Sequence, residues 1–171
     1  MLRIVALGLG LVFVSGSAMS GSITSGHLAL SDVRAIATPP SARAGAAYMV
    51  ISNAGDTDDR LLSVRSEAYP NVQIHRTEID GSVARMVHVE AIEIPAGAST
   101  ELAPGGAHVM FMGIKGSPFE VGDVIPVQLV FEKGGIVDVV IPVLPISEAQ
   151  GQQGSHGDHS GHEHGASHSG S

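Results

Sequence analysis

The sequence predicts an all-β domain that folds as an antiparallel sandwich or barrel. About nine short segments rich in aliphatic and β-branched residues alternate with turns every eight to twelve residues, a pattern typical of such folds. No segment combines a sustained helical repeat of apolar residues with capping signals, so we expect no long helix.

The expected strands follow one another along residues 27–146, and the turn residues indicate where each strand ends. Residues 21–26 are expected to be a flexible start, which would leave His27 exposed. Pro39-Pro40 ends the first strand because proline has no N–H to donate. In order, the strands are expected over 27–38, 45–53, 60–66, 71–79, 82–94, 99–102, 107–112, 124–131 and 136–143.

The segment 53–59 (NAGDTDD) is the most acidic turn of the expected domain. Its aspartates next to a glycine resemble part of a calcium-binding loop. The EF-hand pattern, however, ends its loop with a glutamate and has a helix on each side, and neither is found here. We therefore interpret 53–59 as a solvated loop. Met49, in the apolar run before it, is interpreted as a core residue.

A hairpin is predicted around the dipeptide 80–81 (Asp-Gly). Asp-Gly between two runs of alternating apolar residues is typical of a two-residue type I′ turn. Counting outward from this turn places His75 opposite Met86, and directly opposed residues have Cβ atoms roughly 4.5–5.5 Å apart. The same register opposes Arg76 and Arg85, a like-charge pair that would weaken it slightly.

A second pair of nitrogen and sulfur side chains lies in the segment 107–114 (AHVMFMGI). His108 and Met110 are two residues apart, so on a strand both point to the same face. If this strand meets the hairpin, the two pairs together form a site with two imidazoles and two thioethers. Such a donor set suits Cu(I), whereas Mg, Ca and Mn prefer oxygen ligands.

Two further side chains compete as ligands. Met112 shares the face of Met110 and is the alternative sulfur ligand, but Gly113 turns the chain away, so we favour a hydrophobic wall beside the site. His88 shares the face of Met86 and is a fifth candidate, which we interpret as a surface or supporting histidine.

The spacing His-x10-Met-x21-His-x-Met resembles that of the periplasmic copper chaperone family PCu(A)C. The similarity includes AAYMVISNAGDTDDRLLSV, PGGAHVMFMGI and GDVIPVQLVFEKGGIVDVVIPV, and it covers roughly residues 28–144. The resemblance implies a cupredoxin-like Greek-key barrel with its metal site near the surface. It also implies copper delivery for cytochrome c oxidase assembly, directly to the binuclear copper site or through a thiol-bearing intermediary. The family's usual aromatic residue in the first strand is absent here, where Val33-Arg34 stands instead.

Residues 1–20 have the pattern of a secretory signal peptide. Arg3 precedes an apolar run over 4–14, and small residues follow at 15–18. The run is shorter than the about twenty apolar residues of a membrane-spanning helix, although an uncleaved anchor is the alternative. We therefore expect a periplasmic protein.

Net charge and cysteine content limit which classes of partner and which covalent links we expect. The formal charge is −8, which argues against nucleic acid and is compatible with an acidic surface that attracts cations. The sequence contains no cysteine, so we expect neither a disulfide nor a lipid-modified cysteine. This also fits an exported copper carrier, because exported thiols tend to become oxidised, whereas a thioether stays a soft ligand.

The composition changes at about Ser147, beyond which Gly, Ser, Gln and His dominate. We expect the tail 147–171 to be disordered, because it cannot bury enough apolar surface to fold. Interspersed histidines in such a chain can wrap Cu(II), Zn or Ni; the alternative is a solubilising tail. The candidate secondary ligands are His156, His159, His162, His164 and His168.

Three function classes remain open. The first is a copper chaperone, not an enzyme, that meets the membrane only through its acceptor. The second is a copper oxidoreductase, although no G-x-S-x-G, phosphate loop or recognisable carboxylate pair is present, and a blue-copper carrier would need a cysteine ligand. The third is metal sequestration or resistance, with the tail as the main binding segment.

Overall fold

The computed structural model describes residues 23–81 and 83–148, which form an all-β barrel. Within these residues there are eleven strands and one short 3-10 helix. They are β1 (Ile23–Ser25), β2 (Leu28–Ile36), β3 (Ala44–Asn53), β4 (Asp59–Arg65), β5 (Val72–Asp80), β6 (Val83–His88), β7 (Ile92–Ile94), β8 (Ser99–Leu102), β9 (Ala107–Met112), β10 (Val124–Phe131), β11 (Gly135–Leu144) and η1 (Ile146–Glu148).

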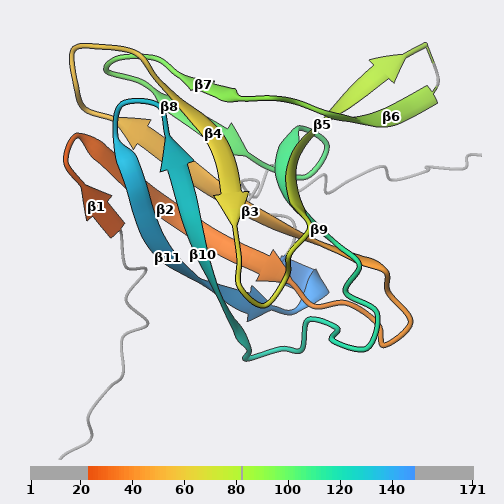
Figure 1. Ribbon diagram of the computed structural model, residues 1–171. Coiled ribbons are helices and arrows are strands. Elements are labelled where there is room, and N and C mark those ends of the chain that lie inside the picture. The colour runs from red at the N-terminus through yellow and green to blue at the C-terminus, as the bar shows by residue number, and fades with distance from the viewer. Residues whose placement is uncertain (1–22, 82, 149–171) are drawn as a thin grey trace, which may run out of the picture.

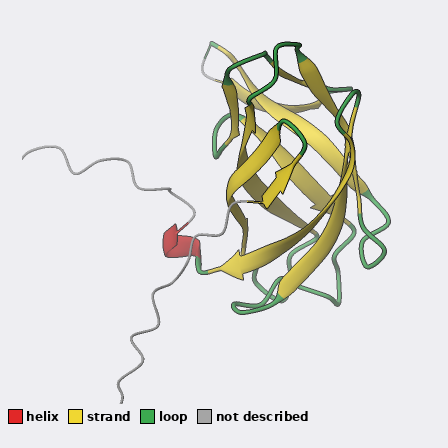
Figure 2. Ribbon diagram, turned by 90° about the vertical axis from the view of Figure 1, so that its left-hand side faces the viewer, coloured by secondary structure: helices red, strands yellow, loops and turns green. Residues whose placement is uncertain are grey.

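The strands join in one hydrogen-bonded path, β6-β5-β9-β3-β2-β11-β10-β4-β7, with β1 paired to β2 and β8 to β3. The path curls around a single core (Figures 1 and 2), so that β7 at one end contacts β3 and β8. The all-β prediction is confirmed. One pairing departs from the antiparallel rule, because β2 and β11 run parallel where Ala35 and Ile36 meet Val143 and Leu144. No described helix is long and apolar enough to cross a membrane.

The core is aliphatic, with one aromatic cluster beneath the strands that matter most for the candidate site. Met49 is fully buried, as predicted for a core residue. The rings of Tyr69, Phe111 and Phe119 lie edge-to-face with centroids 5.3–5.6 Å apart. A Cβ added at Gly45 would overlap the Phe119 ring, so the cluster packs directly against the backbone of β3. This packing holds β3 and β9 in place from the core side.

Two polar residues of the segment expected to be a solvated loop are buried instead. Asp59 is fully buried and accepts hydrogen bonds from the backbone N–H groups of Arg60, Lys133 and Gly134. The Asn53 amide is also buried and donates to the carbonyls of Thr57 and Ile94. The prediction was wrong for these residues because each also has partners that are distant in sequence, Ile94 for Asn53 and the 133–134 turn for Asp59. Residues 56–58 between them are exposed.

His27 is also more enclosed than predicted. Its side chain is 34% exposed, and Nε2 lies 3.4 Å from a carboxylate oxygen of Asp59. The segment before it was expected to be flexible, but Ile23–Ser25 forms β1 and pairs with Leu28–Leu30. The barrel therefore begins earlier in the chain than residue 27.

The predicted hairpin exists, but its register is shifted by two residues. Asp80 pairs with Val83, and Gly81 has a φ of +61°, which the turns of tight hairpins favour at a glycine. Arg85 therefore faces Glu78 rather than Arg76, so an opposite-charge pair replaces the like-charge pair of the predicted register. The hairpin extends beyond the rest of the barrel (Figure 1), and its residues Ile79 and Val83 are exposed.

The expected strand 82–94 is two strands rather than one. β6 pairs with β5, but β7 pairs with β4, which lies near the opposite end of the strand path. Residues 89–91 connect β6, which pairs with β5, to β7, which pairs with β4. Alternating apolar residues on both sides of this break give the sequence the appearance of one long strand.

Candidate metal centre

His75 lies between two other histidines in one row across the sheet. On β5 it is paired with His88 of β6 on one side and with His108 of β9 on the other. The His75 ring centroid is 6.0 Å from that of His88 and 6.0 Å from that of His108. The sequence prediction that these two strand regions meet is therefore correct, although His75 faces His108 and His88 rather than Met86.

His108 is held in the orientation that leaves one ring nitrogen free. The residue is 5% exposed, and Nδ1 lies 3.2 Å from the Gly106 carbonyl oxygen. A carbonyl can only accept, so Nδ1–H must donate this hydrogen bond. In the neutral ring this hydrogen bond leaves the lone pair on Nε2, which is the form of imidazole that binds a metal.

His75 shows the same division between its two nitrogens. Nε2–H donates to the side-chain carbonyl of Gln73 at 3.0 Å, whereas Nδ1 is buried and has no hydrogen-bond partner within the described residues. Burial lowers the pKa of His75, and the neighbouring His108 and His88 lower it further. The ring is therefore neutral at pH 7 and presents an unpaired lone pair, which a buried polar atom rarely does.

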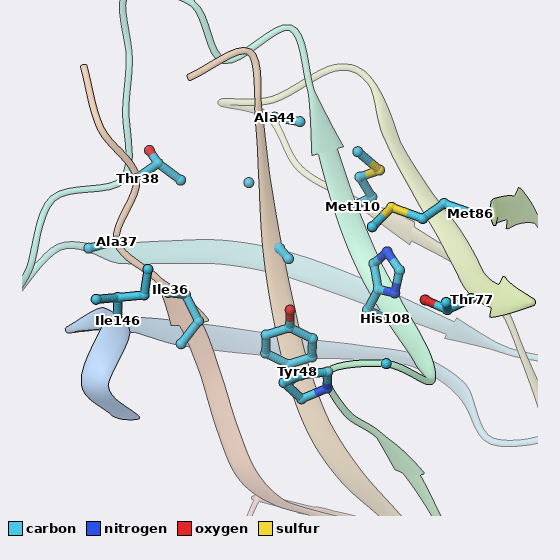
Figure 3. Close-up of a pocket in the computed structure, with 14 residues that line it drawn as sticks. Ile36, Ala37, Thr38, Ala44, Tyr48, Thr77, Met86, His108, Met110 and Ile146 are labelled. Carbon is cyan, nitrogen blue, oxygen red and sulfur yellow. The ribbon is translucent and has the colours of Figure 1, made fainter. Parts of the chain in front are cut away.

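Both predicted sulfur residues line the same cleft as His108. The cleft has a volume of about 370 Å³, and its wall includes Met86 of β6, Met110 and His108 of β9, and Tyr48 of β3. In Figure 3 the Met86 side chain extends toward Met110 and the His108 ring. Met86 lies opposite Thr77, one diagonal step from His75, a position within reach of a long side chain.

Of the two competing ligand candidates, Met112 lies away from the cleft and His88 lies beside His75. Met112 pairs with Ala44 at the far end of β9 and does not line the cleft, so the structure favours Met110 over it. His88 is exposed at the edge of the sheet, directly beside His75. The prediction therefore gave the correct face for His88, but the structure places it nearer to His75 than expected.

Sequence reasoning missed Tyr48 and Arg34, which continue the histidine row across β3 and β2. The Tyr48 ring centroid is 6.4 Å from that of His108, and the Arg34 guanidinium lies 5.7 Å from the Tyr48 centroid. Arg34 is 4% exposed and forms an ion pair with Asp32. A charged residue within the apolar stretch after Asp32 was the available signal, because an arginine is rarely buried without a partner.

Residues 28–143 match the family described as "Putative lipoprotein LpqE-like". The chain belongs to this LpqE-like family. Among curated proteins, "Putative lipoprotein Lxx21020" of Leifsonia xyli subsp. xyli (strain CTCB07) is 35% identical to this LpqE-like chain over 99 residues. The match covers 57% of this chain and 59% of that protein, so the chain spans about three fifths of the relative's length.

Solved structures similar to this LpqE-like chain are PCuAC domains. The "Copper-bound PCuAC domain from PmoF2" has a TM-score of 0.62 and 27% identity, and covers 73% of this chain and 98% of that domain. The solution structure of CuI-DR1885 from Deinococcus radiodurans has a TM-score of 0.55 and 28% identity, and covers 74% of this chain and 83% of that protein. The resemblance to PCu(A)C domains predicted from the sequence is therefore confirmed.

Two predicted segments lie outside the described residues. They are the signal peptide over 1–20 and the histidines of the tail, His156, His159, His162, His164 and His168. The last described element, η1, contributes Ile146 to the wall of the cleft (Figure 3). In the sequence, the histidine-containing tail therefore begins right after a residue that lines the cleft.

Proposed function

We propose that this protein is a copper chaperone that carries Cu(I) as its cargo and catalyses no reaction. The observation that supports this most directly is the cleft in which His108, Met86 and Met110 meet, with the His75 ring beside His108. Similar structures include a copper-bound PCuAC domain and a Cu(I) form of DR1885. The four side chains match the donor types that Cu(I) prefers.

The residues present fit a Cu(I) ion in charge as well as in chemistry. In the neutral form of each ring, His108 Nε2 and His75 Nδ1 carry the lone pair, because the other nitrogen donates to a carbonyl oxygen. The two thioethers are neutral and need lose no proton when copper binds. Binding would also satisfy the buried Nδ1 atom of His75, which has no hydrogen-bond partner within the described residues.

A carrier must also release its metal, and the four proposed ligands differ in how firmly they are held. His108 is buried, whereas Met86 is 62% exposed on the strand at the edge of the sheet. Thioethers are weaker donors than thiolates, so an acceptor with stronger ligands could replace Met86 first. Release would then proceed by stepwise ligand exchange rather than by unfolding of the barrel.

The proposed acceptor lies in the assembly of cytochrome c oxidase, either the binuclear copper site or a thiol-bearing intermediary, as the PCu(A)C resemblance implies. The signal-peptide pattern and the lipoprotein names of the relatives support export to the periplasm or cell envelope. We expect the Cu(I)-loaded protein to transfer its copper to a soluble copper-site domain of the oxidase, measured by mass spectrometry after separation. Copper that stays on this chain, with an acceptor shown to bind Cu(I), would contradict this role.

The alternative role is metal sequestration, with the histidine tail as the main binding segment. We expect deletion of residues 150–171 to leave one tightly bound Cu(I) and to lower the Cu(II) capacity, because the tail carries imidazoles but no thioether. Competition titration and X-ray absorption of the Cu(I) form would measure this, with mixed nitrogen and sulfur scattering expected. Loss of all tight Cu(I) binding on tail deletion would favour sequestration.

A further inference from the structure

Three imidazoles lie side by side on β6, β5 and β9, the three strands at one end of the strand path. The Cu(I) proposal uses two of them. His88, His75 and His108 occupy one row across β6, β5 and β9, with 6.0 Å between the centroids of neighbouring rings. Two imidazoles on one tetrahedral metal have centroids about 5 Å apart, given metal–nitrogen bonds of about 2 Å. Each neighbouring pair is therefore within a small side-chain rotation of sharing an ion.

We propose that His88, His75 and His108 form a second binding mode of the same centre, selective for divalent copper. This inference rests on the proposed function, because His75 and His108 serve both modes. Imidazole is a preferred ligand of Cu(II), which stands highest among the first-row divalent ions in affinity, whereas thioether favours Cu(I). The oxidation state of the ion then selects whether His88 or the two methionines complete the coordination.

His75, the central ring, can serve as a ligand in both binding modes. The Nδ1 atom of His75 is buried without a hydrogen-bond partner in the described part of the chain, and the ring stands between those of His88 and His108. The His108 ring is fixed by its hydrogen bond to the Gly106 carbonyl, which leaves Nε2 as its donor atom. The hydrogen bonds of these two rings thus define which nitrogen of each is left for an ion.

His88 is the ligand that has to move. Among residues 23–81 and 83–148, no group of three or more His, Asp or Glu side chains is already arranged around one metal position. His88 is exposed on β6, the strand at the end of the path, so its side chain is free to rotate toward His75. The other end of the row is closed by the Tyr48 ring, with the Arg34 guanidinium next to it.

The test uses the full-length chain with the five tail histidines (His156, His159, His162, His164 and His168) replaced by serine, so that the tail cannot mask the folded site. In this parent we expect His88→Ala to weaken Cu(II) binding by about tenfold or more and to change Cu(I) binding by less than about twofold. Met86→Leu should have the opposite effect. Competition titrations with CuSO4 and with Cu(I) measure both affinities, and Cu(II) EPR should show one coordinated nitrogen fewer in His88→Ala.

Glu90→Gln is the matched control, because Glu90 is an exposed residue just beyond β6 and should leave both affinities unchanged. Unchanged Cu(II) affinity and EPR spectrum in His88→Ala would overturn the second binding mode. A parent that fails to bind Cu(I) would instead overturn the chaperone proposal, while the Cu(II) comparison between the parent and His88→Ala would still be decisive for His88.

Discussion

Replacement of His108 by alanine is expected to weaken Cu(I) binding about a hundredfold or more. Loss of a residue that merely orients a metal ligand costs about 10–100-fold in affinity, so loss of a ligand itself should cost at least as much. His108 is also the least exposed of the four proposed ligands, and its Nδ1 hydrogen bond fixes the donor atom. A competition titration with a Cu(I) chelator, together with thermal unfolding to show that the barrel is retained, measures this.

The three methionines near β6 and β9 provide a matched series for the same prediction. Met86→Leu and Met110→Leu remove a sulfur from the cleft at nearly constant volume and should weaken Cu(I) binding strongly. Met112→Leu makes the same chemical change outside the cleft and should have little effect. His75→Ala should likewise weaken Cu(I) binding far more than His88→Ala. Equal affinities across these variants would overturn the assignment of the ligands.

Asp59→Asn is expected to lower the free energy of unfolding by about 3 kcal/mol at pH 7, because hydrogen bonds to a buried charged group contribute more than neutral ones. The Asp59 carboxylate accepts three backbone N–H groups with its two oxygens, two of them from the turn between β10 and β11. An amide replaces one acceptor oxygen with a donor, which would face those N–H groups unfavourably. Urea unfolding at pH 7 measures the difference.

The same substitution should change how stability depends on pH. Burial alone would raise the pKa of Asp59, but the backbone N–H donors outweigh it and hold the pKa below its ordinary value. The stabilisation is therefore complete above pH about 4 and is lost as the pH falls through the lowered folded-state pKa. We expect the difference in the free energy of unfolding between wild type and Asp59→Asn to become smaller at acidic pH. The exposed Asp56→Asn is the control, and a difference that is absent at pH 7 or constant down to low pH would contradict the assigned role.

The fold class could be predicted from the sequence because turn residues and alternating apolar positions are local signals. The hairpin register could not, since a shift of two residues leaves every side chain on its predicted face. His75 and Met86 therefore stayed on the correct side of the sheet even though Met86 lies opposite Thr77. The like-charge pair of Arg76 and Arg85 in the predicted register was the one local sign that this register was wrong.

The burial of Asp59 and its contact with His27 could not be predicted for a different reason. Two of the three backbone N–H partners of Asp59 lie in the turn at Lys133-Gly134, more than seventy residues away, and nothing local to the acidic segment indicates them. The candidate site was more accessible to sequence reasoning, because His108 and Met110 belong to one strand and His75 lies in a recognisable hairpin. The row that continues through Tyr48 depends on strand order, which only the three-dimensional structure gives.

The position of β6 at the end of the strand path has a consequence for the rate of metal exchange. Among the described strands β6 pairs with β5 alone, so it can fray at a far lower free-energy cost than the barrel can unfold. Met86 and His88 would both depart with it, while His75 and His108 stay in place. Substitutions at the hairpin tip, such as at Ile79 or Val83, would then alter how fast copper leaves without altering the melting temperature of the barrel.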